Sequence, residues 1–192
     1  MYTMDDVIRN NGLAGQDEEI LVRRAQQKDT EAFARLYEAY FDKIYRYLAL
    51  RIRNDYEAED LTQQVFMKVM KSISSYKITG VPFASWLYRI AHNQLVDFLR
   101  QKNKKGTVTI EGLPIPDTGD DPQYMIEKQV DIDELQRAVG QLTAAQQEVL
   151  ALRFTGELSI AQCAEIMGRS PGAIKALQHS AVLALRKAMM SN

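Results

Sequence analysis

The sequence predicts an all-α protein of two small helical domains joined by an acidic flexible linker. Three observations support this fold class. Apolar residues recur at three- and four-residue intervals on both sides of the chain's middle, no segment alternates as a strand does, and breakers and acidic residues gather in residues 106–134. We expect a tail over residues 1–18, an N-terminal domain over 19–105, a linker over 106–130 and a C-terminal domain over 131–192.

Four helices are predicted in the N-terminal domain. Residues 19–52 hold two of them, because Asp29 follows a short break and can cap the second helix. The third starts near Asn54 or Asp55, and the acidic residues in its first turns suit the positive end of a helix dipole. The fourth spans residues 83–100 and carries an apolar stripe along one side.

The third helix has an acidic outer face. Glu57, Asp60 and Gln64 share an outward stripe at three- and four-residue spacing, and Phe66 lies nearby as an apolar flank. Such a face suits docking to a protein and disfavours DNA, because carboxylates repel phosphates.

Residues 68–105 form a basic block. Eight basic residues stand there against Asp97 alone, a net charge of +7. The aromatic residues interleaved with these cations are Tyr76, Phe83, Trp86 and Tyr88. Rings next to cations suit single-stranded nucleic acid, where bases stack and phosphates meet Lys and Arg. The alternative is that the rings belong to the core and the cations to a solvated face.

The linker is the most acidic part of the chain. In residues 106–134 only Lys128 opposes eight acidic residues, and glycines and prolines interrupt any helical period. Two interpretations stay open, a solvated tether and a segment with a binding role of its own.

The C-terminal domain contains a predicted helix-turn-helix. Ser159 can cap a first helix that ends at Gly168, and Ser170 followed by Pro171 is a strong start for a second. The second helix of such a motif enters the major groove of DNA. The alternative is a helical hairpin that binds no DNA.

No catalytic or metal-binding constellation is found, and we expect a non-enzyme without a cofactor. His92 and His179 lie in different domains, so they form no shared site. Cys163, the only cysteine, sits on an apolar helix face and is expected in the core. The chain has neither a secretory signal pattern nor an apolar run near the about 20 residues of a spanning helix, so a cytoplasmic setting is expected.

Three motifs resemble the extracytoplasmic-function (ECF) group of the sigma-70 family. The run DYEAEDLTQQVF (residues 55–66) is similar to the core-polymerase-binding motif of region 2. The run FASWLYRIAHN (83–93) with DFLR (97–100) is similar to its promoter-melting part, and VLALRF (149–154) with the helix-turn-helix resembles region 4.

The resemblance implies a sigma factor that binds core RNA polymerase and promoter DNA, single-stranded at the −10 element and duplex at the −35 element. An anti-sigma factor is implied as a further partner. The residues implied in polymerase binding are Asp55, Glu57, Asp60, Leu61, Gln64, Val65 and Phe66. Those implied at the −10 element are Ser75, Tyr76, Lys77, Phe83, Trp86, Arg89, Asn93 and Arg100. Those implied at the −35 element are Ser170, Pro171, Gly172, Lys175, Ala176, His179, Ser180 and Arg186.

The chain departs from the family pattern in the recognition helix. Ala176, Leu177 and Ser180 stand where polar or Arg residues are common, which indicates greater reliance on backbone contacts and DNA shape. Two alternative functions remain, a stand-alone helix-turn-helix regulator and a helical adaptor without a nucleic-acid role.

The net charge of −1 conceals this organisation. It is the sum of four blocks with net charges of −4, +7, −7 and +3, so an acidic docking region and an acidic linker cancel two basic surfaces. A near-zero total therefore does not argue against nucleic-acid binding here.

Overall fold

The computed structural model describes residues 15–78, 81–104, 135 and 137–190, and within these ranges the chain is helical with no strand. The all-α prediction is thus confirmed for the described part of the chain. The predicted tail and linker lie outside the described residues, apart from the last residues of the tail.

The N-terminal group comprises α2 (Gly15–Gln26), α3 (Thr30–Ile52), α4 (Asp55–Ser72), the short 3₁₀ helix η1 (Ile73–Ser75) and α5 (Phe83–Lys104). Its helices begin where the capping residues predicted. The Asp29 side chain accepts hydrogen bonds from the backbone N–H groups of Glu31 and Ala32, and the Asn54 side chain accepts one from Glu57. α5 extends four residues beyond the predicted end at Arg100.

The C-terminal group comprises α7 (Ala144–Leu150), the π-helical turn η2 (Ala151–Thr155), α8 (Ile160–Met167) and α9 (Pro171–Met190). The first and third of these helices begin with a capping box, in which Thr143 pairs with Gln146 and Ser159 with Gln162. Gly168 ends α8 at φ 62°, a left-handed conformation that glycine adopts without strain.

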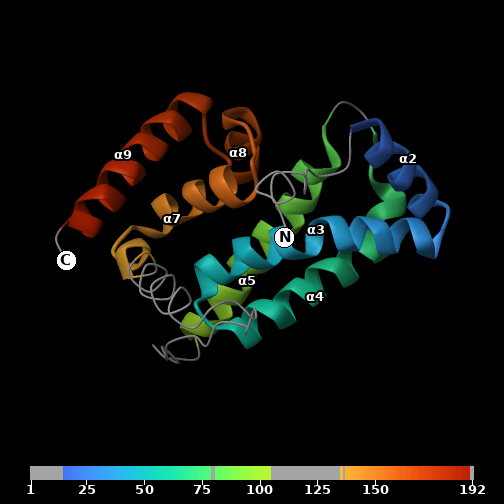
Figure 1. The fold of residues 1–192 in the computed structure, drawn as a ribbon, viewed down its shortest axis with the longest axis horizontal. Helices are drawn as coiled ribbons and strands as arrows, with labels where there is room; N and C mark the ends of the chain where they lie inside the picture. Colours follow the sequence, from blue (N-terminus) through green and yellow to red (C-terminus); the bar gives the residue numbers. More distant parts are fainter. Residues whose placement is uncertain (1–14, 79–80, 105–134, 136, 191–192) are drawn as a thin grey trace, which may run out of the picture.

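The two groups pack against each other. Figure 1 shows α7 and α8 lying alongside α3 and α5, and one hydrophobic core runs from Leu21 in α2 to Ala181 in α9. At the contact, a Cβ on Gly156 would lie 3.0 Å from Cζ of Tyr88, so glycine permits this close approach. The sequence predicts two domains and gives no sign of this packing.

Candidate protein and nucleic-acid interfaces

The outer face of α4 carries two of the seven residues predicted to bind polymerase. Asp60 and Gln64 are exposed one turn apart, and the Gln64 amide donates a hydrogen bond of 2.7 Å to the Asp60 carboxylate. Leu61, Val65 and Phe66 are instead buried. α4 presents them to the core.

The prediction of Phe66 as an apolar flank of the acidic face is wrong. Its ring lies 4.8 Å from that of Tyr37 and 6.1 Å from that of Phe41, measured between centroids, because α4 packs broadly against α3. The buried side chains of α4 form a wide arc that extends to both sides of the face toward the core. Phe66 lies at one side of this arc.

Asp55 and Glu57 turn toward neighbouring helices. Asp55 accepts a hydrogen bond of 2.9 Å from the Tyr45 hydroxyl, and Glu57 forms an ion pair of 2.6 Å with Lys102 of α5. The prediction that Glu57 shares an outward stripe with Asp60 is therefore corrected. Both carboxylates hold α4 in place between α3 and α5.

Three exposed apolar side chains of α4 were missed by the sequence reasoning. Tyr56, Met67 and Met70 are 79%, 54% and 57% exposed, and they flank Asp60 and Gln64 on the outer side of the helix. Their signal was available, since they stand out of phase with the apolar stripe that faces the core. We call these five residues the docking face.

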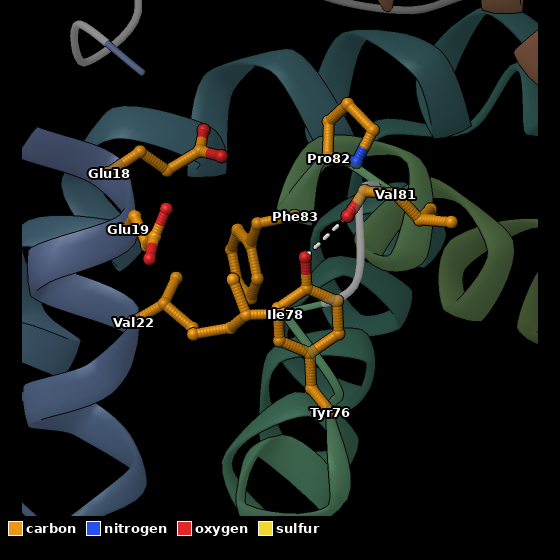
Figure 2. Close-up of a pocket in the computed structure, with 8 residues that line it drawn as sticks. All are labelled: Glu18, Glu19, Val22, Tyr76, Ile78, Val81, Pro82 and Phe83. Atoms are coloured by element: carbon orange, nitrogen blue, oxygen red, sulfur yellow. Dashed lines mark hydrogen bonds between the residues drawn. The ribbon is translucent and has the colours of Figure 1, made fainter. Parts of the chain in front are cut away.

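A pocket of about 260 Å³ opens beside the segment between η1 and α5. Figure 2 shows Val22 and two carboxylates from α2 on one side and the Tyr76 and Phe83 rings on the other. The lining residues are Glu18, Glu19, Val22, Tyr76, Ile78, Val81, Pro82 and Phe83. We call this site the α2 pocket.

Aromatic side chains build the floor of the α2 pocket. The Tyr76 ring lies 5.7 Å from Phe83 and 5.0 Å from Trp86, which is partly exposed. The Tyr76 hydroxyl donates a hydrogen bond of 2.6 Å to the Val81 carbonyl. Burial, and then the charges of Glu18 and Glu19, raise the pKa of Tyr76, so this hydroxyl stays protonated.

The residues predicted at the −10 element do not form one patch. Tyr76 and Phe83 are buried in the pocket wall, whereas Ser75, Lys77, Asn93 and Arg100 are exposed. Phe83 and Arg100 stand about 25 Å apart along α5, at 1.5 Å per residue. Arg89 forms an ion pair with Glu165 of α8, so in this arrangement it is engaged by the C-terminal group.

The helix-turn-helix is formed as predicted. The Ser170 hydroxyl accepts a hydrogen bond of 3.2 Å from the Ala173 N–H at the start of α9, and Ile174 and Ala181 are buried on its inner side. All eight residues predicted at the −35 element are exposed. Ser180 nevertheless faces α7, since its hydroxyl lies 3.4 Å from the Gln146 amide, and it is separated from Lys175 and His179.

A hollow of about 450 Å³ beside α9 contains two polar residues that are not among those predicted at the −35 element. Arg153 of η2 donates from Nε to the Gln178 side-chain oxygen over 3.0 Å and from a guanidinium nitrogen to the Leu158 carbonyl. Because arginine only donates, Gln178 must turn its oxygen inward and keep its NH₂ group as a free donor among the described residues. Lys175 and His179 line the same hollow, so several side chains that can donate hydrogen bonds lie around it. No short-range signal in the sequence links Arg153 to Gln178.

The remaining candidate residues are structural. Cys163 is fully buried, as expected, and burial raises its thiol pKa to about 11, so the thiolate is scarce at neutral pH. His92 contacts Glu148 through Nδ1 over 2.8 Å. Within the described residues there is no cluster of His, Cys, Asp or Glu that could hold a metal ion. Among those residues no helix combines the length and apolarity needed to cross a bilayer.

Comparisons with known proteins follow the same division of the chain. The family described as Sigma-70 region 2 matches residues 36–105, and that described as Sigma-70, region 4 matches residues 132–185. The chain is 36% identical to the ECF RNA polymerase sigma factor BldN of Streptomyces coelicolor, over 87% of this chain and 64% of that protein. It is 30% identical to the ECF RNA polymerase sigma factor SigW of Bacillus subtilis, over 86% of this chain and 93% of that one.

Solved structures share the fold. The sigma factor RpoE of Bartonella quintana, crystallised with the anti-sigma factor NepR, superposes with a TM-score of 0.70 at 22% identity, covering 82% of this chain and 96% of that chain. The structure of CnrH in complex with the cytosolic domain of CnrY gives a TM-score of 0.68 at 18% identity, covering 91% and 98%.

Proposed function

This chain belongs to the ECF group of the sigma-70 family, the sigma factors that direct core RNA polymerase to promoters, and we propose how its described surfaces divide that work. The observation that carries the proposal is the presence, on separate helices of one chain, of an acidic and apolar protein-docking face, an aromatic pocket and a helix-turn-helix lined with donors. In this proposal the polymerase supplies the chemistry of RNA synthesis, and the chain works in the cytoplasm.

The docking face of α4 binds core polymerase in this proposal. Its two polar members, Asp60 and Gln64, are pre-arranged by their mutual hydrogen bond. Tyr56, Met67 and Met70 supply exposed apolar area that an interface would bury. Buried Leu61, Val65 and Phe66 keep the helix fixed, so that docking costs little ordering.

The α2 pocket receives an unstacked base of the −10 element. Flipping a base costs a few kcal/mol, which stacking and hydrogen bonds must offset. Phe83 and Val22 offer apolar contact. Glu18 accepts from the Tyr40 hydroxyl and Glu19 pairs with Arg23, so each offers its remaining carboxylate acceptor sites at the rim. Carboxylate acceptors favour a base with exocyclic amino donors. Exposed Lys77 lies next to the pocket wall in sequence and is suited to a neighbouring phosphate.

The N-terminal half of α9 binds the −35 element as duplex. Gly172, Lys175, Ala176 and His179 are exposed on it, and the first turn offers backbone N–H groups to a phosphate. Ser170 caps this turn, Pro171 opens it, and Arg186 lies further along toward the C-terminus of α9. With Ser180 turned toward α7, few side chains remain to contact bases directly, which supports shape-dependent recognition.

An anti-sigma factor is the proposed regulatory partner, because the solved relative RpoE is described in complex with one. The acidic linker, for which we propose a place in the nucleic-acid channel of the polymerase, lies outside the described residues.

Run-off transcription with purified core polymerase on genomic fragments tests the proposal. The chain is expected to yield discrete transcripts, and Asp60→Ala combined with Gln64→Ala is expected to weaken holoenzyme formation about tenfold, a loss of about 1.4 kcal/mol. Glu38→Gln, on the exposed side of α3, is the control. Tight and specific promoter binding by the chain alone, without transcripts when polymerase is added, would favour a stand-alone regulator.

A further inference from the structure

Gln26, the last residue of α2, makes a bridge between this helix and both ends of η1. Its side-chain nitrogen donates one hydrogen bond of 3.0 Å to the Ile73 carbonyl and one of 2.6 Å to the Tyr76 carbonyl. A glutamine NH₂ group carries two hydrogens, so both are used. The amide oxygen cannot take this place, because two carbonyl oxygens face it.

The segment that Gln26 holds depends on such a partner. η1 is a single 3₁₀ turn of three residues, and no side chain caps its start. A turn of this length is marginal by itself, because few backbone hydrogen bonds hold it. Tyr76 follows in an extended conformation, so the carbonyls at this point have left the regular helical pattern. The Gln26 amide supplies donors where the chain leaves the helix.

The same face of α2 also lines the α2 pocket. Glu18, Val22 and Gln26 follow one another at four-residue spacing and therefore lie on one side of this helix. Glu18 and Val22 line the pocket, whereas Gln26 is not among its lining residues. Figure 2 shows the Tyr76 ring on the side opposite Val22. Because Gln26 connects α2 to Tyr76, it fixes the separation of the two walls.

Tyr76 transmits this constraint to the rest of the wall. Its backbone carbonyl accepts from Gln26, and its hydroxyl donates over 2.6 Å to the Val81 carbonyl. Its ring centroid lies 5.7 Å from that of Phe83 and 5.0 Å from that of Trp86. The position of the Tyr76 backbone therefore determines where these rings and the Val81 carbonyl stand.

We propose that Gln26 is a positioning residue for the α2 pocket, whose two amide hydrogens hold η1 and Tyr76 so that the wall is shaped for a base before a strand binds. The identity of the ligand rests on the proposed function, but the ordering of the wall does not. A site held in its binding shape spends less of its interaction free energy on ordering.

Three substitutions of similar length separate hydrogen-bond donation from size. Gln26→Glu keeps the shape, but its carboxylate only accepts and would face two carbonyls. Gln26→Met keeps the length without a polar group, and Gln26→Lys keeps donors on a long side chain. Gln27→Glu, on the exposed neighbour, is the matched control. If Gln26 only fills space, Gln26→Met and Gln26→Glu behave as wild type, and Gln26→Lys has no advantage over them.

The first readout is the fluorescence of Trp86 in the isolated full chain. Trp86 is the only tryptophan in the sequence, and its ring packs against those of Tyr76 and Phe83, at 5.0 and 5.6 Å between centroids. Loss of the donors in Gln26→Met and Gln26→Glu is expected to raise the acrylamide quenching constant about twofold, because the wall opens locally. Gln26→Lys and the control are expected to stay near wild type.

The second readout is the affinity of the holoenzyme for a strand. Fluorescence anisotropy measures binding of a fluorescein-labelled single-stranded −10 oligonucleotide from a promoter found by run-off transcription, intact or with an abasic site at each position in turn. One abasic site is expected to weaken binding to wild type about tenfold. Gln26→Met is expected to bind the intact strand about that weakly, and the same abasic site should then add little.

Several results would overturn the proposal. Folded Gln26→Met and Gln26→Glu with unchanged quenching would show that the amide does not order the wall. Increased quenching without loss of strand affinity, or an equal loss for intact and abasic strands, would place its effect outside base binding. A loss in Gln26→Lys as large as that in Gln26→Met would exclude a role for the donors.

Circular dichroism checks that each variant keeps its helices, and Gln26→Met serves alone if Gln26→Glu does not fold. Failure of the proposed function has a different signature. If no abasic site weakens binding to wild type, the pocket takes no base, whereas the quenching of Trp86 still decides whether Gln26 orders the wall.

Discussion

At the scale of single residues, the pair of Arg153 and Gln178 gives the sharpest expectation for DNA binding. Gln178→Glu keeps an acceptor for Arg153 but replaces the NH₂ donor by a second oxygen and adds negative charge beside the proposed phosphate contacts. We expect holoenzyme binding to a promoter fragment found by run-off transcription to fall about tenfold, because one donor is lost and one repulsion gained.

Gln27→Glu provides the matched control, since Gln27 is exposed between α2 and α3, far from the helix-turn-helix in sequence. Filter binding at constant salt compares the two, because phosphate contacts depend strongly on ionic strength. Equal affinity of Gln178→Glu and wild type would mean that the amide does not contact DNA.

The residues that the sequence placed correctly are those with local causes. Asp29, Asn54, Ser159, Gly168 and Ser170 cap or end helices through contacts within four residues, and these are visible as patterns. The prediction that Glu57 faces outward was wrong because its partner Lys102 lies 45 residues away in the sequence. The predictions for single site residues were therefore wrong where a helix distant in the sequence determines the direction of a side chain.

At the scale of elements, α4 shows how a helix divides between core and partner. Met67→Gln with Met70→Gln removes exposed apolar area from the docking face without touching the core. We expect thermal stability to stay within about 0.5 kcal/mol of wild type and affinity for core polymerase to fall about tenfold.

Met190→Gln repeats the substitution on a methionine that is 76% exposed at the end of α9 and is expected to change neither property. Polymerase affinity is measured by titration of labelled chain with core enzyme, and stability by thermal unfolding. If both variants lose affinity equally, the docking face of α4 is not the specific determinant.

The outer face of α4 was only half predictable. The acidic stripe follows from spacing, but the width of the buried arc depends on α3 packing on one flank and the ion pair with α5 on the other. That arc takes in Phe66 and leaves Met67 outside. A period of 3.6 residues locates the centre of a buried stripe and does not fix its edges.

At the scale of the whole molecule, the packing of the two groups was beyond sequence reasoning. Glu148 stands between Gln147 and Val149 in α7, and its partner Tyr47 is 101 residues away in the chain. The alternating block charges predicted separate surfaces, one of which, the acidic linker, lies outside the described residues. They gave no orientation, because the contacts between the groups, among them a buried ion cluster of four residues, join side chains far apart in the sequence. The four residues of this cluster are Tyr47, Arg51, His92 and Glu148.

That cluster and the shared core predict cooperative unfolding. Wild type is expected to melt in one transition whose calorimetric and van't Hoff enthalpies agree, since the core is continuous from α2 to α9. Glu148→Ala leaves the Arg51 guanidinium, 8% exposed, without its carboxylate. Removing one partner of a buried pair lowers the free energy of unfolding by about 3–5 kcal/mol. This loss applies only while the two groups are packed together.

Separation of the two groups relieves this cost by exposing Arg51 to water, so the variant is expected to melt in two transitions, one for each helical group. Differential scanning calorimetry of wild type, Glu148→Ala and Glu38→Ala measures this, the last being the exposed control. A single transition in Glu148→Ala, merely shifted to lower temperature, would show that the apolar core alone couples the groups. Two transitions would show that the buried charge couples them, since the apolar contacts of the interface are the same in both proteins.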